Sequence, residues 1–388
     1  MTTNELKQNF EQIYGADTIA TAFAPGRVNL IGEHIDYNGG YVFPCALSFG
    51  TYVVARARDD RQINLSSINM QLKVSANINN LVFKPENNWA NYPLGVIHEF
   101  VKAGFAAKIT GVDLLFYGNV PHGSGLSSSA SLEVATAVII NHLFNLNIDM
   151  VELVKMAQSA ENHFVGVSCG IMDQFASGMG KKDHAVMLRC SDLHYQYAPI
   201  KMDGMKIIIA NTNKKRGLLD SKYNERRAEC EAALANIKTA IPNLEFLCNI
   251  TPAEFGGVVQ HITNPVAAKR AQHVVCENQR VIDAVDKLNN NDISAFGQLM
   301  IQSHESLRDL YEVTGDELDA LFEEALKING CVGSRMTGAG FGGCTVSIVM
   351  DAAVPTFIEQ VGKSYTQRTG LTADFYIAEI GAGAGILD

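Results

Sequence analysis

The sequence contains few charged residues and no long hydrophobic run. Asp, Glu, Lys and Arg make up 19% of its 388 residues, whereas 47% are hydrophobic. No apolar run approaches the roughly 20 residues that a membrane-spanning helix requires. The net charge of −10 disfavours a nucleic-acid partner, because phosphate backbones require a basic face. We therefore expect a soluble globular protein with neither a membrane nor a nucleic-acid partner. A small anion can still bind where a metal ion or a helix dipole compensates its charge.

The sequence also contains no closely paired cysteines, and we expect no secretory leader. The eight cysteines are scattered and form no C-x-x-C motif. The segment from Met1 to Lys7 is polar and lacks the apolar core of a signal peptide. These features are typical of a cytoplasmic protein with reduced thiols.

The nucleotide-binding motif G-x-x-x-x-G-K-[ST] does not occur, but another Gly- and Ser-rich loop runs from Pro121 to Ser131. An apolar run at 111–117 precedes it and predicts a buried strand, and the apolar stretch 132–140 predicts a helix. In a strand–loop–helix unit, the free N–H groups and positive dipole end of the helix favour an anion such as phosphate. The structural alternative is a helix capped by serine, but one cap needs only one serine.

A second unusual stretch lies between Thr21 and Gly40. Arg27, Glu33, His34 and Asp36 fall within ten positions and are surrounded by apolar residues and glycines. A solvated charge run would be richer in lysine and flanked by polar residues. We interpret the stretch as a set of donors and acceptors for a polar ligand; an internal salt-bridge cluster beside a turn is the alternative.

Two acidic residues stand alone in apolar surroundings. Glu161 falls on the apolar helical stripe that contains Val154, Ala157 and Phe164. Because burying an unpaired carboxylate is costly, Glu161 needs an Arg or Lys partner or a metal ion, and we favour the metal. Asp173 is either a helix cap or a working carboxylate.

A third glycine-rich stretch, 333–344, contains G-x-G-x-x-G at Gly338, Gly340 and Gly343. A dinucleotide-binding fingerprint would be followed by a helix, whereas the apolar stretch 345–350 predicts a strand. We therefore expect a loop between two strands that supports the first glycine loop. Trp89 is interpreted as a core residue, with base stacking as the alternative.

The overall pattern predicts an α+β protein of two lobes, 1–200 and 201–388. We expect the segments 51–58 and 61–67 to pair as neighbouring strands around Asp59 and Asp60. The segment 375–380 is expected to be the last strand, with a possible return to the first lobe, and a flexible Gly/Ala tail is expected after it. A monomer is expected.

Taken together, the three unusual stretches resemble the GHMP family of small-molecule kinases along almost the whole chain. The segment 26–40 is similar to the N-terminal motif of the members that phosphorylate galactose. This resemblance implies two α+β lobes with the active site in the cleft between them. It also implies transfer of a phosphoryl group from ATP, with Mg²⁺, to the anomeric hydroxyl of α-D-galactose, an early step of galactose metabolism.

The resemblance assigns a role to individual residues. Asp173 would be the catalytic base, and Arg27 would stabilise the charge beside it. The implied sugar-binding residues are Glu33, His34, Ile35, Asp36, Gly170, Asp173 and Tyr223. The implied ATP-binding residues are Gly123, Ser124, Gly125, Leu126, Ser127, Ser128 and Ser129, together with Trp89 and Ser67. Ser129 and Glu161 would bind Mg²⁺.

Three other functions are compatible with these patterns. The first is a family member for another sugar, such as arabinose or N-acetylgalactosamine. The second is a sensor that binds galactose and ATP without turnover, although such sensors lack the residue pair retained here as Ser129-Ala130. The third is a two-lobed binding protein in which the Gly/Ser loop only caps a helix.

Overall fold

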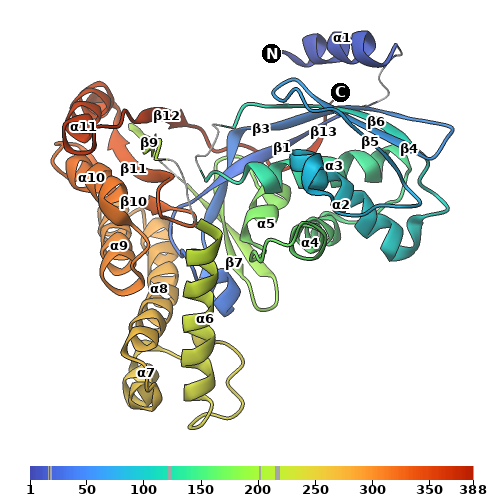
Figure 1. Ribbon diagram of the computed structural model, residues 1–388. Helices are drawn as coiled ribbons and strands as arrows, with labels where there is room; N and C mark the ends of the chain where they lie inside the picture. Colours follow the sequence, from blue (N-terminus) through green and yellow to red (C-terminus); the bar gives the residue numbers. More distant parts are fainter. Residues whose placement is uncertain (16, 18–19, 121–124, 201, 215–218, 388) are drawn as a thin grey trace.

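The computed structural model describes residues 1–387 except 16, 18–19, 121–124, 201 and 215–218. Two lobes, each built from a sheet and helices, lie side by side (Figure 1). The expected two-lobed α+β architecture is confirmed. None of the helices in these described ranges is both long and apolar enough to cross a membrane.

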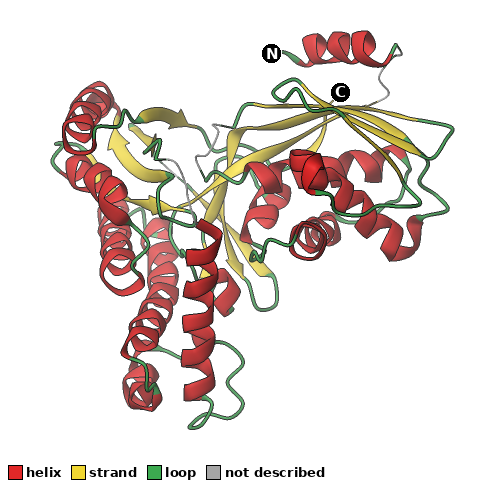
Figure 2. Cartoon of the chain, viewed as in Figure 1, coloured by secondary structure: helices red, strands yellow, loops and turns green. Residues whose placement is uncertain are grey.

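The first lobe is organised around a six-stranded sheet with the order β13-β1-β3-β6-β4-β5. Helices cover one face of this sheet and α1 covers the other (Figure 2). The strands are β1 (Ala20–Asn29), β3 (Pro44–Ala57), β4 (Gln62–Ser67), β5 (Val74–Asn77), β6 (Val112–Gly118) and β13 (Gly385–Leu387). The helices are α1 (Thr3–Tyr14), α2 (Asn91–Phe100), α3 (Ser128–Leu143), α4 (Met150–Ser159) and α5 (Met172–Met179).

The second lobe contains a four-stranded sheet with the order β10-β11-β9-β12. Helices α10 and α11 bury an apolar cluster against it, which includes Ile208, Leu321 and Phe357. The strands are β9 (Met205–Asn211), β10 (Cys331–Thr337), β11 (Cys344–Met350) and β12 (Asp374–Ala378). The helices are α6 (Leu219–Ile237), α7 (Pro252–Val258), α8 (Pro265–Asn289), α9 (Ile293–Ser306), α10 (Gly315–Leu326) and α11 (Val354–Thr369).

A small third sheet of β2 (Tyr41–Val42), β7 (His184–Arg189) and β8 (His194–Pro199) adjoins the junction of the lobes. One apolar cluster runs from Val28 of β1 through Val42 and Leu188 of this sheet to Val274 of α8. Each of these side chains is fully buried. Because removing apolar side chains from water is favourable, this shared cluster holds the two lobes together.

The elements that flank the glycine-rich stretches agree with the sequence analysis. The predicted strand at 111–117 is β6, and the predicted helix lies within α3. The third glycine stretch connects β10 and β11, which pair as an antiparallel hairpin. The apolar sequence of α3 has no polar face because the helix is buried between the sheet and its neighbours.

Two expectations, one about strand pairing and one about the C-terminal tail, are wrong. Strands β3 and β4 do not pair, because β6 lies between them and bonds to β3 in antiparallel and to β4 in parallel orientation. This insertion lets the buried carboxylate of Asp113 on β6 accept from Arg56 on one side and from Asn64 on the other. The expected flexible tail is also incorrect, since Gly385–Leu387 form β13 and pair with β1.

The predicted strand at 375–380 is β12, which pairs with β9 of the second lobe. It is not the last strand, because β13 follows it. The chain returns to the first lobe directly after β12, where Ile380 forms an isolated bridge with Leu47 of β3, and β13 then pairs with β1. The lobe boundary at residue 200 stays a prediction.

Helix α9 packs so closely on β10 that only glycine fits at position 297. A β-carbon at Gly297 would lie 2.2 Å from the carbonyl oxygen of Val332. We predict that Gly297→Ala lowers the free energy of unfolding by about 1–3 kcal/mol through overpacking. Thermal unfolding measures the effect. Gly256→Ala in α7 is the matched control, because a β-carbon there meets no atom within 4 Å and alanine favours the helix by about 0.5–1 kcal/mol. A midpoint for Gly297→Ala at or above that of the control would contradict this packing.

Candidate active site in the cleft between the lobes

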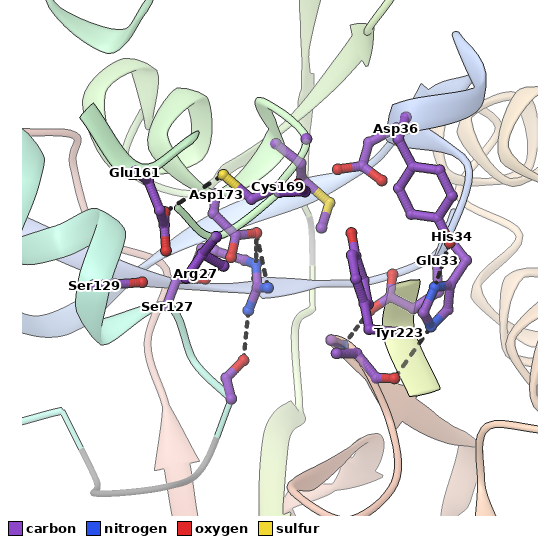
Figure 3. Close-up of a pocket in the computed structure, with 18 of the residues that line it drawn as sticks. Arg27, Glu33, His34, Asp36, Ser127, Ser129, Glu161, Cys169, Asp173 and Tyr223 are labelled. Carbon is purple, nitrogen blue, oxygen red and sulfur yellow. Dashed lines mark hydrogen bonds and ion pairs between the residues drawn. The ribbon is translucent and has the colours of Figure 1, made fainter. Parts of the chain in front are cut away.

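A cavity brings together the segments that the sequence analysis singled out. The stretch 27–37, the loop at 125–129, the segment 167–173, Tyr223 of α6 and the third glycine loop all contribute to its lining (Figure 3). Of the predicted phosphate-loop residues, Gly123 and Ser124 lie outside the described residues. The predicted motifs therefore converge on one site.

An ion pair between Arg27 and Asp173 lies at the centre of this site. The Nε and Nη2 atoms of Arg27 donate to Oδ1 of Asp173 at 2.9 and 2.8 Å. Nη1 of the same guanidinium donates to the carbonyl oxygen of Gly125 at 2.8 Å. The Arg27 side chain is 4% exposed, whereas that of Asp173 is 31% exposed and faces the cavity. Arg27 thus ties the carboxylate to the glycine-rich loop.

Ser127 does not serve as an ordinary helix cap. It occupies the N-cap position of α3 with a left-handed backbone (φ 59°), and its side chain makes no capping hydrogen bond. Its hydroxyl instead donates to Oδ2 of Asp173 at 2.6 Å. Both oxygens of Asp173 are therefore oriented by neighbours, and the simple capping interpretation does not describe Ser127. Leu126 contributes its backbone, since its side chain is buried and its carbonyl accepts from the Arg27 amide.

The third glycine loop packs on this junction, as the sequence predicts. A β-carbon at Gly338 (φ +86°) would lie 3.1 Å from the Gly125 carbonyl oxygen and 3.9 Å from Nη2 of Arg27. Glycine is required both by the backbone conformation and by this close approach.

Asp36 and Tyr223 form the side of the cavity away from the glycine-rich loop. Asp36 is half-buried, and Gly170 approaches it so closely that a β-carbon at Gly170 would lie 1.7 Å from Oδ2 of Asp36. Burial, together with the charge of Asp173, raises the pKa of Asp36 to about 6. The Tyr223 ring lies 5.8 Å from that of His34. Ile35, by contrast, is fully buried in the core and offers the site no side-chain surface.

Glu33 and His34 are almost completely buried and have partners within the protein. The Glu33 carboxylate accepts from the Gly338 amide and from Asn29, with Nη1 of Arg335 3.7 Å away. Burial nonetheless raises the pKa of Glu33. His34 contacts Tyr37 through Nδ1 and the Ala339 carbonyl through Nε2. Burial, with a contribution from His273, lowers the pKa of His34 to about 3, so the imidazole is neutral.

A second group of acids surrounds the beginning of α3. Glu161 lies in a π-helical turn, Ala160–Val165, and its partners are the amide of Gln174, the thiol of Cys169 and the hydroxyl of Ser129, none of them a cation. Nε2 of Gln174 donates to Glu161 at 2.6 Å and to the fully buried Glu133 at 3.0 Å. Burial and the charge of Asp173 raise the pKa of Glu161 to about 6.

These groups fit a Mg²⁺ ion that also binds the nucleotide. Oε1 of Glu133 is buried without a hydrogen-bond partner, so the cluster lacks compensating positive charge. Carboxylate and hydroxyl oxygens are the ligands that Mg²⁺ prefers. Among the described residues no three acidic, His or Cys side chains form a complete metal cage. A Mg²⁺ ion held by one or two protein groups and by substrate phosphates needs no such cage.

Sequence reasoning missed Glu133 and Gln174. Glu133 is an acid within the apolar run of α3 and carries the same signal that identified Glu161. Gln174 gave no signal, because its two carboxylate partners come from other elements. Trp89 and Ser67 do not line the cavity. The Trp89 ring packs edge-on against Phe116 in the core. The roles of Trp89 and Ser67 in ATP binding stay predictions.

Known proteins match the chain over almost its whole length. The family model described as the galactokinase galactose-binding signature matches residues 8–57, the GHMP kinases N terminal domain matches 91–181 and the GHMP kinases C terminal model matches 284–367. Together with the cleft, these matches define a small-molecule kinase of the GHMP type.

The most informative similarities are to galactokinases. The chain is 54% identical to the galactokinase of Fusobacterium nucleatum subsp. nucleatum and 50% identical to that of Bacillus subtilis, with 98% of each chain covered. A crystal structure of Lactococcus lactis galactokinase complexed with galactose superposes with a TM-score of 0.96, at 42% identity and 99% coverage of both chains. The Methanococcus jannaschii mevalonate kinase, at a TM-score of 0.66, 18% identity and 94% and 99% coverage, shows the shared fold. The chain belongs to the galactokinases of the GHMP kinase family.

The raised pKa of Asp36 predicts a pH-dependent stability. The Asp36 carboxyl has a pKa of about 6 in the folded protein and about 3.9 in the unfolded chain. The folded protein therefore binds the Asp36 proton more tightly, and the contribution of Asp36 to stability falls as the pH rises from about 4 to about 6. Asn cannot ionise, so Asp36→Asn should raise the unfolding midpoint at pH 8, and the gain should shrink towards pH 4.5.

Differential scanning calorimetry at both pH values measures this effect. Asp203→Asn, at an exposed position, is the matched control and should leave the midpoint unchanged. A loss of stability for Asp36→Asn at pH 8 would mean that the carboxylate is stabilised rather than strained by its surroundings.

Proposed function

We propose that the chain transfers the γ-phosphoryl group of ATP to the anomeric hydroxyl of α-D-galactose, with Asp173 as the base. Asp173 would accept the proton of this hydroxyl as the oxygen bonds to phosphorus. Arg27 would orient the carboxylate and stabilise the charge that develops beside it. The anomeric hydroxyl is more acidic than an ordinary alcohol, so a carboxylate suffices as the base.

The observation that carries this proposal is the junction of Asp173 with Arg27 and Ser127. Ser127 belongs to the loop that precedes α3, and Arg27 donates to the Gly125 carbonyl of the same loop. A phosphate bound at the N-terminus of this helix, where free N–H groups and the dipole favour anions, would lie next to the carboxylate. Phosphoryl transfer depends mostly on such positioning, which can lower a barrier by about 7–11 kcal/mol.

The sugar would occupy the part of the cavity bounded by Asp36, Gly170 and Tyr223. The Asp36 carboxylate lies at the cavity and is a suitable acceptor for sugar hydroxyls. Glu33 and His34 would shape this part of the cavity, and Ile35 would contribute backbone alone. The galactose complex of the Lactococcus lactis relative supports galactose as the ligand.

Ser129 and Glu161 would hold Mg²⁺ together with the phosphates of ATP. When bound, the ion neutralises charge on the transferring phosphoryl group. Gln174 would orient Glu161 by donating to one of its oxygens.

We also propose that the chain works as a monomer in the cytoplasm, which size-exclusion chromatography and cell fractionation can test.

Removing the base should abolish turnover but not nucleotide binding. We predict that Asp173→Ala lowers kcat by about 10²–10⁴-fold or more, the usual contribution of a general base, while affinity for ATP stays within a fewfold. A coupled ADP assay and calorimetric titration with a non-hydrolysable ATP analogue measure the two quantities. Asp203→Ala, at an exposed position, is the control. Turnover of Asp173→Ala within a fewfold of wild type would exclude Asp173 as the base.

Neutralising Glu161 should weaken metal binding directly. We predict that Glu161→Gln lowers the affinity for Mn²⁺ in the presence of an ATP analogue by about tenfold or more, as followed by electron paramagnetic resonance. Glu152→Gln on α4 removes an exposed acid and is the control. Equal Mn²⁺ affinities in the two variants would argue against Glu161 as a ligand.

The remaining alternatives differ in substrate and in turnover. Sugar-dependent ADP release across galactose, N-acetylgalactosamine, arabinose and glucose separates them, and we expect galactose to have the highest kcat/KM. Galactose binding without ADP release would favour a sensor instead.

A further inference from the structure

The chain crosses from the second lobe to the first after β12. The residues that follow β12 lead to β13, which pairs with β1 (Figure 1). We call this stretch, Glu379–Ala384, the C-terminal connector. Four of its six residues are glycine or alanine, so its attachment depends on backbone hydrogen bonds rather than on side chains. The partners of those bonds are therefore the elements that the connector holds in place.

The connector meets β3 at an irregularity that lies opposite Arg27. Pro25 of β1 pairs with Gly50 of β3, but Arg27, two residues further along β1, pairs with Ala46. Three residues of β3, 47–49, therefore face a single residue of β1 and cannot follow the regular ladder. Irregularities of this kind are common beside active sites, where they redirect a side chain.

The first half of the connector binds to this part of β3. The amide of Ser48 donates to the carbonyl of Glu379 at 3.1 Å. The amide of Gly381 donates at 2.9 Å to the carbonyl of Ala46, which is the strand partner of Arg27. The connector thus provides the pairing that β1 cannot give to this stretch of β3.

The second half of the connector binds to the end of α5. The amide of Gly383 donates to the carbonyl of Gly180 at 2.8 Å, and the amide of Ala384 donates to the carbonyl of Ser177 at 2.9 Å. The buried hydroxyl of Ser177 in turn donates to the carbonyl of Pro25 on β1 at 2.7 Å. These bonds hold the end of α5 against β1, and the first turn of the same helix carries the proposed base.

We propose that the C-terminal connector positions the ion pair of Arg27 and Asp173 by holding α5 at the end opposite to Asp173. The ion pair restrains the first turn of the helix and the connector restrains its last turn, so the direction of α5 is fixed at both ends. Because the connector is also bonded to the strand partner of Arg27, its displacement moves the two members of the pair relative to each other. The proposal rests on the proposed function, in which this geometry sets the rate.

Two neighbouring glycines offer a matched pair of variants. A β-carbon at Gly383 would lie 2.5 Å from the carbonyl oxygen of Gly178 and 2.7 Å from the amide nitrogen of Gly180, so Gly383→Ala pushes the connector away from α5. A β-carbon at Gly385 meets no atom of the described residues within 4 Å, so Gly385→Ala is the control. Neither glycine has a positive φ, and the two substitutions therefore differ only in the space available.

The ion pair can be observed directly in the protein without ligands. The Nε–H group of Arg27 is buried and donates to Asp173, so it should give a separate, slowly exchanging signal in ¹⁵N-labelled protein, which Arg27→Lys identifies. We expect Gly383→Ala to shift this signal and to accelerate its exchange with water, and Gly385→Ala to leave it unchanged. An unchanged Arg27 signal in folded Gly383→Ala protein would overturn the proposal.

Kinetics test the consequence for turnover. We expect Gly383→Ala to lower kcat by about 10–100-fold, because a displacement of about 1 Å can cost about 10²-fold in rate even when the mutation lies far from the chemistry. KM for galactose and for ATP should stay within a fewfold, since none of the connector's residues, all of which the structure describes, lines the cavity. Calorimetric titration with a non-hydrolysable ATP analogue counts the folded sites, so that an unfolded fraction is not mistaken for a lower kcat. Gly385→Ala should match wild type in kcat and in both KM values.

A second variant keeps the test decisive if Gly383→Ala does not fold. Ser177→Ala removes only the hydroxyl that bonds to Pro25, and it should shift the Arg27 signal and lower kcat in the same direction. Ser347→Ala, which loses a buried hydroxyl contact with Ser334 in the second lobe, is its control. Equal behaviour of the two serine variants in both measurements would overturn the proposal. A shifted Arg27 signal with a wild-type kcat would confirm that the connector positions the ion pair and would contradict Asp173 as the base.

Discussion

The ion pair between Arg27 and Asp173 is the constraint on which the site depends. It joins β1, the beginning of α5 and, through the Gly125 carbonyl, the loop before α3. Because Arg27 is almost completely buried, its charge must be compensated at this position, and displacing either partner would leave an uncompensated charge. In the proposed mechanism the pair would therefore fix the position of the base, Asp173, relative to a phosphate bound at the N-terminus of α3.

Three further acids lie at or behind the cavity: Asp36 and Glu161 line it, and Glu133 lies behind Gln174. Asp36, Glu161 and Glu133 all have raised pKa values because they are buried near one another or near Asp173. Such an arrangement is unfavourable in the empty protein, and the sugar hydroxyls and Mg²⁺ proposed to bind here would relieve it. Under this proposal, stability and substrate binding make opposite demands on the same residues, as is common at active sites.

Local signals predicted much of this structure. Apolar runs and glycines located β6, α3 and the β10–β11 hairpin, and isolated acids in apolar surroundings identified Asp173 and Glu161. The predictions that failed concern pairings between distant segments, namely the position of β6 between β3 and β4 and the ordering of the expected flexible tail as β13 against β1. The contact of His34 with Ala339 likewise could not be predicted from spacing, because 305 positions separate the two residues in the sequence.

The most direct test is a crystal structure with galactose and a non-hydrolysable Mg²⁺–ATP analogue bound together. The account predicts that the anomeric oxygen lies within about 2.6–3.2 Å of a carboxylate oxygen of Asp173, with the γ-phosphorus on its other side and the phosphates at the N-terminus of α3. A sugar whose anomeric hydroxyl points away from Asp173, or a nucleotide bound away from this helix, would contradict it.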